Sequence, residues 1–545
     1  MSSTKTSVVQ SERLFPNTKG SSEKTVPLSL LDATTVNFSP TSAVWLIERP
    51  TVGSKFDVVE HLRCALRVAL DAYPQWCGHV KAITSLDNTT VESHFPPHAR
   101  RFGRAYVHYG TPQDPGVEFI HATSSLTLDD LCPLSRPALW DRQSSPLGEL
   151  VSSTALINAL RPAPTNEASI SPPGLSFQVT KLACGGFTLG IKSTHPLADI
   201  TALVQFLKDW AWVSREILSN HTSPAVSSQT TSVFEPGLLD SAARGDINAD
   251  EPDSALVQQA ADLPLHRFDW WAQCPERPNP AIPDAFHGQD LPPVGKPMPW
   301  SEWDTSAPVS HYVAHFTHEQ VKAILKEATK GSISSDFRIS QHDAVLAHVW
   351  ASIIRARNLQ NDPNPVHCDL TYGVRPALKL GEGFIGSPII IINAEMNGTE
   401  MPTTTSEMTG DESRLHAVAR RIRETINTVQ KPGALGAHLH SVAFEKSPQR
   451  IWQAFLGRRH ILVTTWARAG VYDINFGLHH ASTGIRYAQS VMPNLDGIVM
   501  IQEAPPSNLT NVPAPKSWTE NGVDVSIHIC AEDMDRLVQD PLLFP

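Results

Sequence analysis

Cysteine is sparse in this chain, and its arrangement excludes two common ways of stabilising a small domain. The 545 residues include seven cysteines, and no two of them form a C-x-x-C pair. A cysteine zinc site or a disulfide framework requires paired or regularly repeated spacing. Neither feature is expected, and the cysteines are predicted to be reduced thiols.

Clustered positive charge and long apolar runs are also absent from the sequence. The formal net charge is −11 and Lys and Arg form no run, whereas a nucleic-acid surface needs clustered cations. No stretch reaches the length of a membrane span, and residues 1–20 lack the apolar segment of a secretory signal. We therefore expect a cytoplasmic protein without nucleic-acid or membrane partners.

Composition divides the chain into two halves. Residues 1–25 are polar and are expected to form a flexible N-terminus. Residues 219–310 begin with a Ser/Thr-rich stretch and later carry Pro at a density that opposes regular structure. We interpret 219–310 as a crossover linker between an N-terminal domain, 26–218, and a C-terminal domain, 311–545.

Both halves alternate short strands with amphipathic helices. In the first, Val59, Leu62 and Leu66 recur at helical spacing before Pro74. In the second, Ser340 precedes a helix with an acidic residue three positions on, which is a capping-box pattern. This order predicts an α/β protein with two sheets and outer helices.

The segment His195-Pro-Leu-Ala-Asp199 lies between an apolar strand, 186–194, and a helix with apolar side chains at helical spacing. A histidine at such a turn can face a cleft and take and return a proton. Asp199 can cap the helix or pair with a cation. On spacing alone, a structural role for His195 is more common than a catalytic one. The choice between the two roles therefore depends on the surrounding sequence.

Several segments resemble those of one enzyme family, in the same order along the chain. "STHPLAD" at 193–199 is similar to the HxxxD motif of the BAHD acyltransferases. "SQHDAVLAHVWASIIRAR" at 340–357, "YGVRPALKLGEGFIGSPI" at 372–389 and "ILVTTWARAGVYDINFG" at 461–477 are similar to later family segments. The long Pro/Ser-rich inserts are similar to those of fungal members in specialised metabolism.

The resemblance implies a fold and an activity. The fold would be two similar chloramphenicol-acetyltransferase-like domains, each a mixed sheet with flanking helices, with the active site in a tunnel between them. The enzyme would be a monomer that transfers an acyl group from acyl-CoA, its co-substrate, to a hydroxyl or amine of a small natural-product acceptor. No cofactor would be permanently bound. His195 would be the general base for direct attack through a tetrahedral intermediate.

Further residues receive roles from the resemblance. Thr464 and Trp466 match the family's T-S-W and would donate hydrogen bonds to the oxyanion. Without the resemblance, a strand residue and a core aromatic are the favoured interpretations. Asp199 would pair structurally with Arg375.

The motif that holds the acyl-donor entrance in the family is altered. Its D-F-G-W-G is matched by Asp473, Asn475, Phe476 and Gly477 in D-I-N-F-G. Ile200 also replaces the glycine that usually follows the motif aspartate. Because of these departures, the resemblance does not predict the shape of the donor entrance or the width of the pocket.

Other polar residues are weaker candidates. Arg458 and Arg459 could contact the anionic donor, although a solvated loop is the favoured alternative. The pairs His438/His440 and His479/His480 have no carboxylate or cysteine at ligand spacing, so they are expected to be loop residues and no metal site is expected.

Two alternatives stay open beside a CoA-dependent transferase. One is a condensation-like enzyme that uses a carrier-bound acyl donor. The other is a cyclase or binding protein that keeps the fold without acyl transfer. The absence of a G-x-S-x-G elbow opposes a serine hydrolase.

Overall fold

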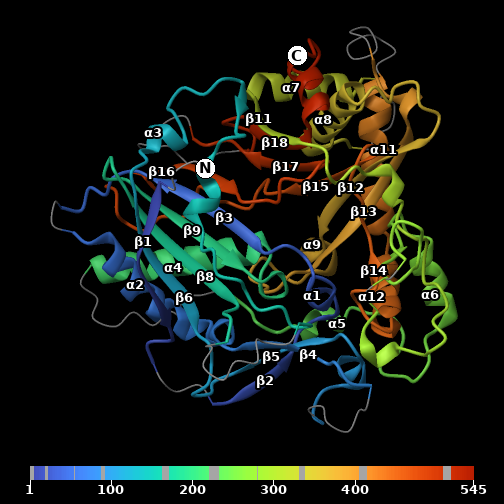
Figure 1. Ribbon diagram of the computed structural model, residues 1–545, viewed down its shortest axis with the longest axis horizontal. Coiled ribbons are helices and arrows are strands. Elements are labelled where there is room, and N and C mark those ends of the chain that lie inside the picture. The colour runs from blue at the N-terminus through green and yellow to red at the C-terminus, as the bar shows by residue number, and fades with distance from the viewer. Residues whose placement is uncertain are drawn as a thin grey trace.

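The structure is a computed structural model. It describes residues 5–18, 22–53, 56–86, 93–161, 171–219, 232–278, 280, 282–330, 338–403, 414–480, 482–506 and 517–545. These residues form two large mixed sheets with helices packed around them (Figure 1). Within the same ranges, no helix combines the length and apolarity that crossing a membrane would require.

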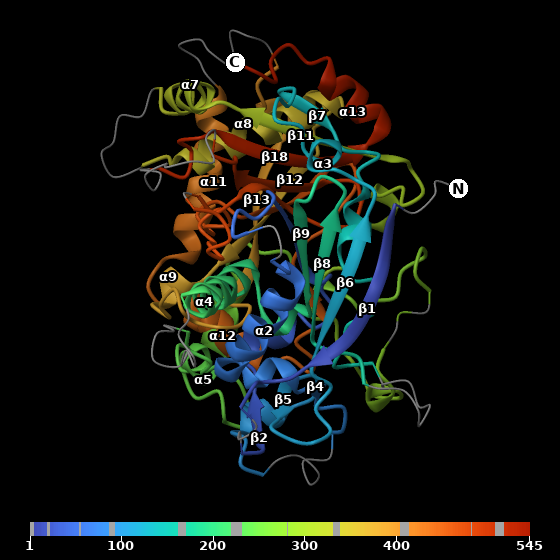
Figure 2. The same ribbon diagram turned by 90° about the vertical axis from the view of Figure 1, so that its left-hand side faces the viewer.

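The first sheet has six strands, and only the β6–β8 pair is parallel. Figure 2 shows four of them, β9, β8, β6 and β1, side by side. In spatial order the strands are β1 (Thr6–Leu14), β6 (Val117–Ser124), β8 (Leu175–Leu182), β9 (Phe187–Ser193), β3 (Thr41–Ile47) and β16 (Ile485–Ser490).

The second sheet has seven strands, with parallel pairs at β12–β15 and β15–β17. In spatial order these are β13 (Ile389–Asn397), β12 (Pro365–Gly373), β15 (His460–Thr465), β17 (Ile498–Glu503), β18 (Val523–Cys530), β11 (Val309–Phe316) and β7 (Leu139–Asp141). Smaller sheets are formed by β2 (Lys24–Pro27), β5 (Ala105–Tyr109) and β4 (His79–Ala82), and by β10 (Phe268–Asp269) and β14 (Ile451–Trp452).

The helices at 58–69, 200–218 and 341–356 match the segments predicted from apolar spacing and capping. The longer ones are α2 (Val58–Ala69), α4 (Ile200–Leu218), α6 (Ser254–Ala261), α7 (His318–Ala328), α8 (Gln341–Ala356), α11 (Arg414–Val429), α12 (Ala434–Phe444) and α13 (Ala531–Val538). The short ones are α1 (Leu30–Thr34), α3 (Leu128–Leu131), α5 (Gly237–Asp240) and α9 (Arg375–Leu378). The capping box at the start of α8 is present, between Ser340 and Asp343.

Each sheet has its own core. Strand β3 illustrates the alternation, because Trp45 packs with α2 and α4 while its neighbour Leu46 packs with α3 on the opposite face. A second core unites α7, α8, α11 and α13 with the second sheet. The predicted mixed α/β architecture with outer helices is therefore confirmed.

The two halves exchange segments. Strand β16, from the C-terminal half, pairs with β3 of the first sheet, while β7, from the N-terminal half, pairs with β11 of the second. Residues of 466–478 also pack into the first core. The domain boundaries stay a prediction, but neither sheet is built from one half alone.

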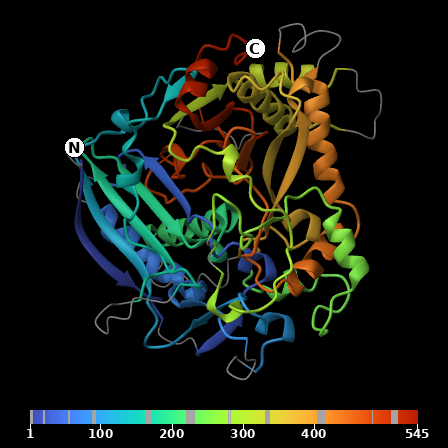
Figure 3. The same ribbon diagram turned by 45° about the vertical axis from the view of Figure 1, so that its right-hand side comes forward.

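Residues 6–14 differ from the expectation of a flexible N-terminus, because they form β1 and pair with β6. Most β1 side chains are exposed, so the segment is polar and its strand character comes from backbone hydrogen bonds. The expected crossover, whose residues 220–231 lie outside the described part, also contains α6, capped by the Asp253 side chain. The described part of this region, green to yellow-green in Figure 3, contacts both halves, because α6 packs against α12 and Trp271 and Phe286 pack with Phe102.

Candidate active site

His195 occupies the turn between the first sheet and its longest helix. Strand β9 ends at Ser193, a single 3-10 turn covers His195–Leu197, and α4 begins at Ile200. Asp199 is the N-cap of α4, and its carboxylate accepts a hydrogen bond from the Ala202 amide at 3.0 Å. The predicted capping role of Asp199 is thus present.

The His195 ring is half-buried and held on two sides. Its Nδ1 lies 2.8 Å from the Ser387 hydroxyl, and Phe38 packs edge-on with a centroid separation of 5.3 Å. Burial lowers the pKa of His195 from 6.5 to about 4, although nearby Asp199 acts to raise it. The imidazole is therefore neutral near pH 7 and has a lone pair for proton abstraction.

Asp199 also joins the two halves through the predicted partner. The Arg375 guanidinium binds its two carboxylate oxygens at 2.5 and 2.9 Å, and both side chains are buried. Arg375 further donates to the carbonyls of Phe384 and Gly386. The bidentate pair fixes the turn at residues 195–199 against the loop that carries Ser387.

A second buried carboxylate, Asp32 on α1, holds the same loop. The Ser387 amide donates to its Oδ1 at 2.6 Å, and the Ser29 amide donates to its Oδ2 at 3.0 Å. Burial raises the pKa of Asp32 to about 7 despite these hydrogen bonds. Neither Asp32 nor Ser387 was a predicted site residue, although Ser387 lies within the segment 372–389 that carried the resemblance.

A small cavity lies next to Phe38. The Phe38 ring contacts both His195 and Trp452 edge-on, with centroids 5.3 and 5.0 Å apart. The lining residues are Thr34, Phe38, Arg267, His438, Val442, Glu445, Pro448, Ile451, Trp452 and Gln453. The cavity walls therefore combine aromatic rings with a few polar groups.

Polar groups in this pocket include an unsatisfied histidine. His438 is 3% exposed and neither ring nitrogen has a hydrogen-bond partner. Burial lowers the pKa of His438 to about 4, so the ring is neutral. Nearby, Arg267 pairs with Glu445 at 3.0 Å.

The expectation that His438 and His440 are loop residues is wrong. Both are buried in α12, an apolar helix that accommodates neutral imidazoles in its packed faces. His440 accepts a hydrogen bond from the Asp253 amide at its Nε2, and its Nδ1 lies 2.8 Å from the Arg244 carbonyl. His479 and His480 lie outside helices and strands, as expected.

Thr464 and Trp466 are not brought to His195 by any hydrogen bond among the described residues. Thr464 lies near the end of β15 and is the register partner of Met500. Trp466 is 5% exposed in the first core, and its amide donates to the Ile501 carbonyl. Their oxyanion role stays a prediction.

The altered D-I-N-F-G motif packs against α4 and accepts hydrogen bonds from it. Phe476 packs edge-on against Trp210 at 5.3 Å, and its carbonyl accepts from the Ser214 hydroxyl at 2.7 Å. The Asn475 carbonyl accepts from Arg215, and Gly477 takes a φ of 75°, which favours glycine. Asp473 lies 3.9 Å from Lys208 at the exposed surface.

The two arginines considered for the donor lie before β15. Arg459 pairs with Asp362 at 2.7 Å and approaches Glu302 at 3.6 Å. Arg458 is exposed, and its guanidinium reaches the Arg357 carbonyl at 3.4 Å. Because Arg459 already has carboxylate partners, its geometry favours the alternative of a surface loop.

Comparison with known proteins gives matches over nearly the whole chain. A family model described as "Transferase family" matches residues 111–541. Acyltransferase AFT15-1 of Alternaria alternata is 26% identical, covering 99% of this chain and 97% of that protein. Acyltransferase abl6 of Leptosphaeria maculans is 24% identical, covering 99% and 98%.

Solved structures share the fold. Vinorine synthase aligns with a TM-score of 0.57 and 13% identity, covering 99% of this chain and 97% of that one. F. graminearum TRI101, solved with ethyl coenzyme A, aligns with a TM-score of 0.59 and 16% identity, covering 95% and 98%.

Proposed function

Since the chain belongs to the Transferase family, that of the BAHD acyltransferases, we propose that it transfers an acyl group from acyl-CoA to a hydroxyl or amine of a small natural-product acceptor. Two fungal relatives of nearly equal length are named acyltransferases. The complex of F. graminearum TRI101 with ethyl coenzyme A supports a CoA thioester as donor. We place the enzyme in the cytoplasm as a monomer.

One observation carries the mechanism: a neutral, half-buried imidazole whose Nδ1 is held by Ser387. We assign the tautomer in which Nδ1–H donates to the Ser387 hydroxyl and Nε2 keeps the free lone pair. Nε2 removes the acceptor's proton as its oxygen or nitrogen attacks the thioester carbonyl. When the tetrahedral intermediate collapses, the same nitrogen returns the proton to the departing CoA thiolate.

The acceptor binds in the pocket beside Phe38. The rings of Phe38 and Trp452 cover its apolar part, and His438 supplies a hydrogen bond to a polar group. Thr464 and Trp466 are assigned the oxyanion on the family resemblance. Asp473, Asn475, Phe476 and Gly477 hold the donor entrance through α4, which starts at the catalytic turn.

The test measures free thiol release from acetyl-CoA and longer acyl-CoAs with a panel of alcohols and amines. Removal of a positioned general base costs about 10²- to 10⁴-fold in rate, so His195→Ala should lose activity by that factor. His480→Ala is the matched control, because His480 is exposed and lies outside the site.

Other outcomes would assign the alternatives. Turnover that requires a carrier-bound acyl group identifies a condensation-like enzyme. Failure of every acyl donor with every acceptor, in protein that is folded, identifies a cyclase or a binding protein on this fold. Wild-type turnover by His195→Ala contradicts the assignment of the base.

A further inference from the structure

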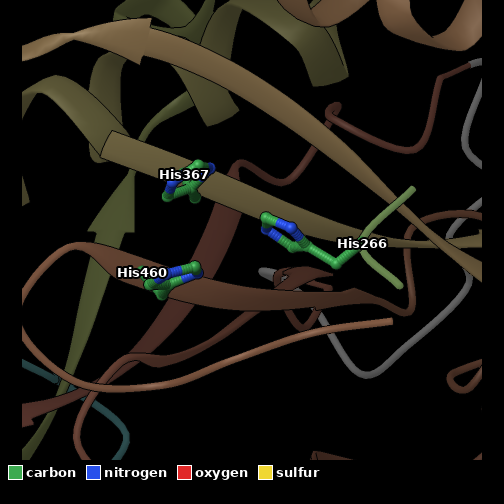
Figure 4. Close-up of side chains that lie close together, drawn as sticks. All are labelled: His266, His367 and His460. Atoms are coloured by element: carbon green, nitrogen blue, oxygen red, sulfur yellow. The ribbon is translucent and has the colours of Figure 1, made fainter. Parts of the chain in front are cut away.

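Three histidines meet on the second sheet, away from the catalytic turn. His367 and His460 are register partners on the neighbouring parallel strands β12 and β15, and their rings stack at 4.3 Å. His266, from the crossover just before β10, places its ring 4.9 and 5.3 Å from theirs. Figure 4 shows the His266 ring pointing toward the other two.

The three rings lie close enough together to hold one ion. One nitrogen from each lies within 4.8 Å of one nitrogen from each of the others. Their side chains are 14%, 12% and 3% exposed for His266, His367 and His460. The cluster is therefore shielded from bulk water but open on the side of His266 and His367.

Neighbouring oxygens orient two of the rings. Asp369 lies two residues after His367 and so shares its face of β12. Its Oδ2 is 3.2 Å from His460 Nδ1, and Asn393 Oδ1 is 3.2 Å from His367 Nδ1. Because these oxygens accept, each Nδ1 carries the proton and each Nε2 keeps its lone pair. Outer carboxylates and carbonyls orient metal-binding histidines in the same way.

The third ring contacts the same buried carboxylate. His266 Nε2 lies 3.1 Å from Asp369 Oδ1, while Asp369 Oδ2 accepts a hydrogen bond from the Phe455 amide at 3.0 Å and faces His460 Nδ1. Asp369 is fully buried, and a buried carboxylate is stabilised by nearby positive charge. A cation among the rings would add positive charge beside it.

We propose that His266, His367 and His460 bind a divalent transition-metal ion, with zinc the best match to three imidazole ligands beside a carboxylate. The ion ties the crossover to the second sheet. Arg267, the next residue, lines the acceptor pocket, and Phe268 stacks on His266 and pairs with Trp452. The ion therefore acts on the pocket wall, and its binding does not depend on the proposed acyl transfer.

The test uses the untagged full chain. After incubation with ZnCl₂ and removal of free ion, elemental analysis should find about one zinc per chain, and added ZnCl₂ should raise the melting temperature. Co²⁺ in its place should give the visible absorption of a tetrahedral site. His266→Gln should abolish uptake and the thermal shift, and Asp369→Asn should weaken affinity about 10- to 100-fold.

The matched control is His528→Gln. His528 stacks on its register partner His311 at 3.8 Å, but in the described part of the chain this pair belongs to no three-residue ligand group. It should keep the zinc and the thermal shift. Absence of both effects in the folded wild-type chain, or equal zinc uptake by His266→Gln, would overturn the proposal. Circular dichroism identifies variants that have not folded, and His266→Gln alters a residue outside the helices and strands.

Discussion

In the proposed mechanism, the neutral state of His195 determines at which pH the enzyme can work. An imidazole surrounded by Phe38 and the turn has lost much of the water that would stabilise its charged form. The proposed base is weaker than a solvated histidine, but it is unprotonated at every pH in the neutral range. The proton transfer must then accompany attack on the carbonyl rather than precede it.

The pH profile tests this state. Only the neutral ring accepts a proton, so activity falls as pH drops through the pKa of His195. Because burial lowers that pKa to about 4, kcat/KM should stay nearly constant from neutral pH down to about 5 and fall below it. Measurement of kcat/KM against pH checks this, with circular dichroism at each pH to confirm folding. An acid limb centred near the ordinary 6.5 would contradict it.

His438 tests the acceptor pocket. His438→Leu keeps a buried side chain but removes two unpartnered ring nitrogens. A hydrogen bond to the acceptor is worth about 0.5–1.5 kcal/mol, so the acceptor KM should rise about 2- to 12-fold. The KM for acyl-CoA should stay unchanged. An unchanged acceptor KM would remove His438 from acceptor binding.

Single residues differ in how far sequence reveals them. The Asp199–Arg375 pair was expected because both residues stand in family motifs. The contact between His195 and Ser387 spans 192 positions, and no local pattern marks that serine. The His266, His367 and His460 cluster was missed for a related reason: it depends on the register of β12 against β15, which sequence spacing does not fix.

At the scale of elements, α4 depends on one carboxylate with two functions. Asp199 caps the first turn of α4, and its carboxylate also accepts two hydrogen bonds from the Arg375 guanidinium. Breaking a buried pair by removing one partner costs about 3–5 kcal/mol, since the other charge stays buried. We therefore expect Arg375→Met to lower the free energy of unfolding by about that amount. Urea unfolding measures it.

Two controls accompany that variant. Lys208→Ala removes an exposed pair with Asp473 and should cost less than about 1 kcal/mol. The double variant Asp199→Asn/Arg375→Met should recover part of the stability, because no unpaired charge remains. A loss for Arg375→Met as small as that for Lys208→Ala would show that the buried pair does not stabilise the turn.

Edge elements were the hardest to predict at this scale. The buried strand β9 and the amphipathic α4 have the apolar spacing expected of them, and their bounds follow the predicted segments closely. Strand β1 has mostly exposed side chains, so its composition is that of a loose terminus. The position of β1 depends on backbone pairing with β6, and such pairing produces no periodic pattern of apolar residues in the sequence.

At the scale of the whole molecule, the exchanged strands make each half depend on the other. β16 completes the first sheet beside β3, and β7 completes the second beside β11. The Asp199–Arg375 pair adds a buried charge contact across the halves. Large proteins with separate domains usually unfold in stages. Here each sheet contains a strand from the other half, so neither half can unfold completely while the other sheet stays intact.

We therefore expect the two sheets to lose protection together. Hydrogen exchange followed by mass spectrometry at increasing urea compares amides of β9 in the first sheet with those of β18 in the second. The midpoints should coincide in the wild type and shift together in Arg375→Met, because that variant weakens a contact shared by both halves. If β9 loses protection at lower urea than β18, the first sheet unfolds alone and the exchanged strands do not couple the halves.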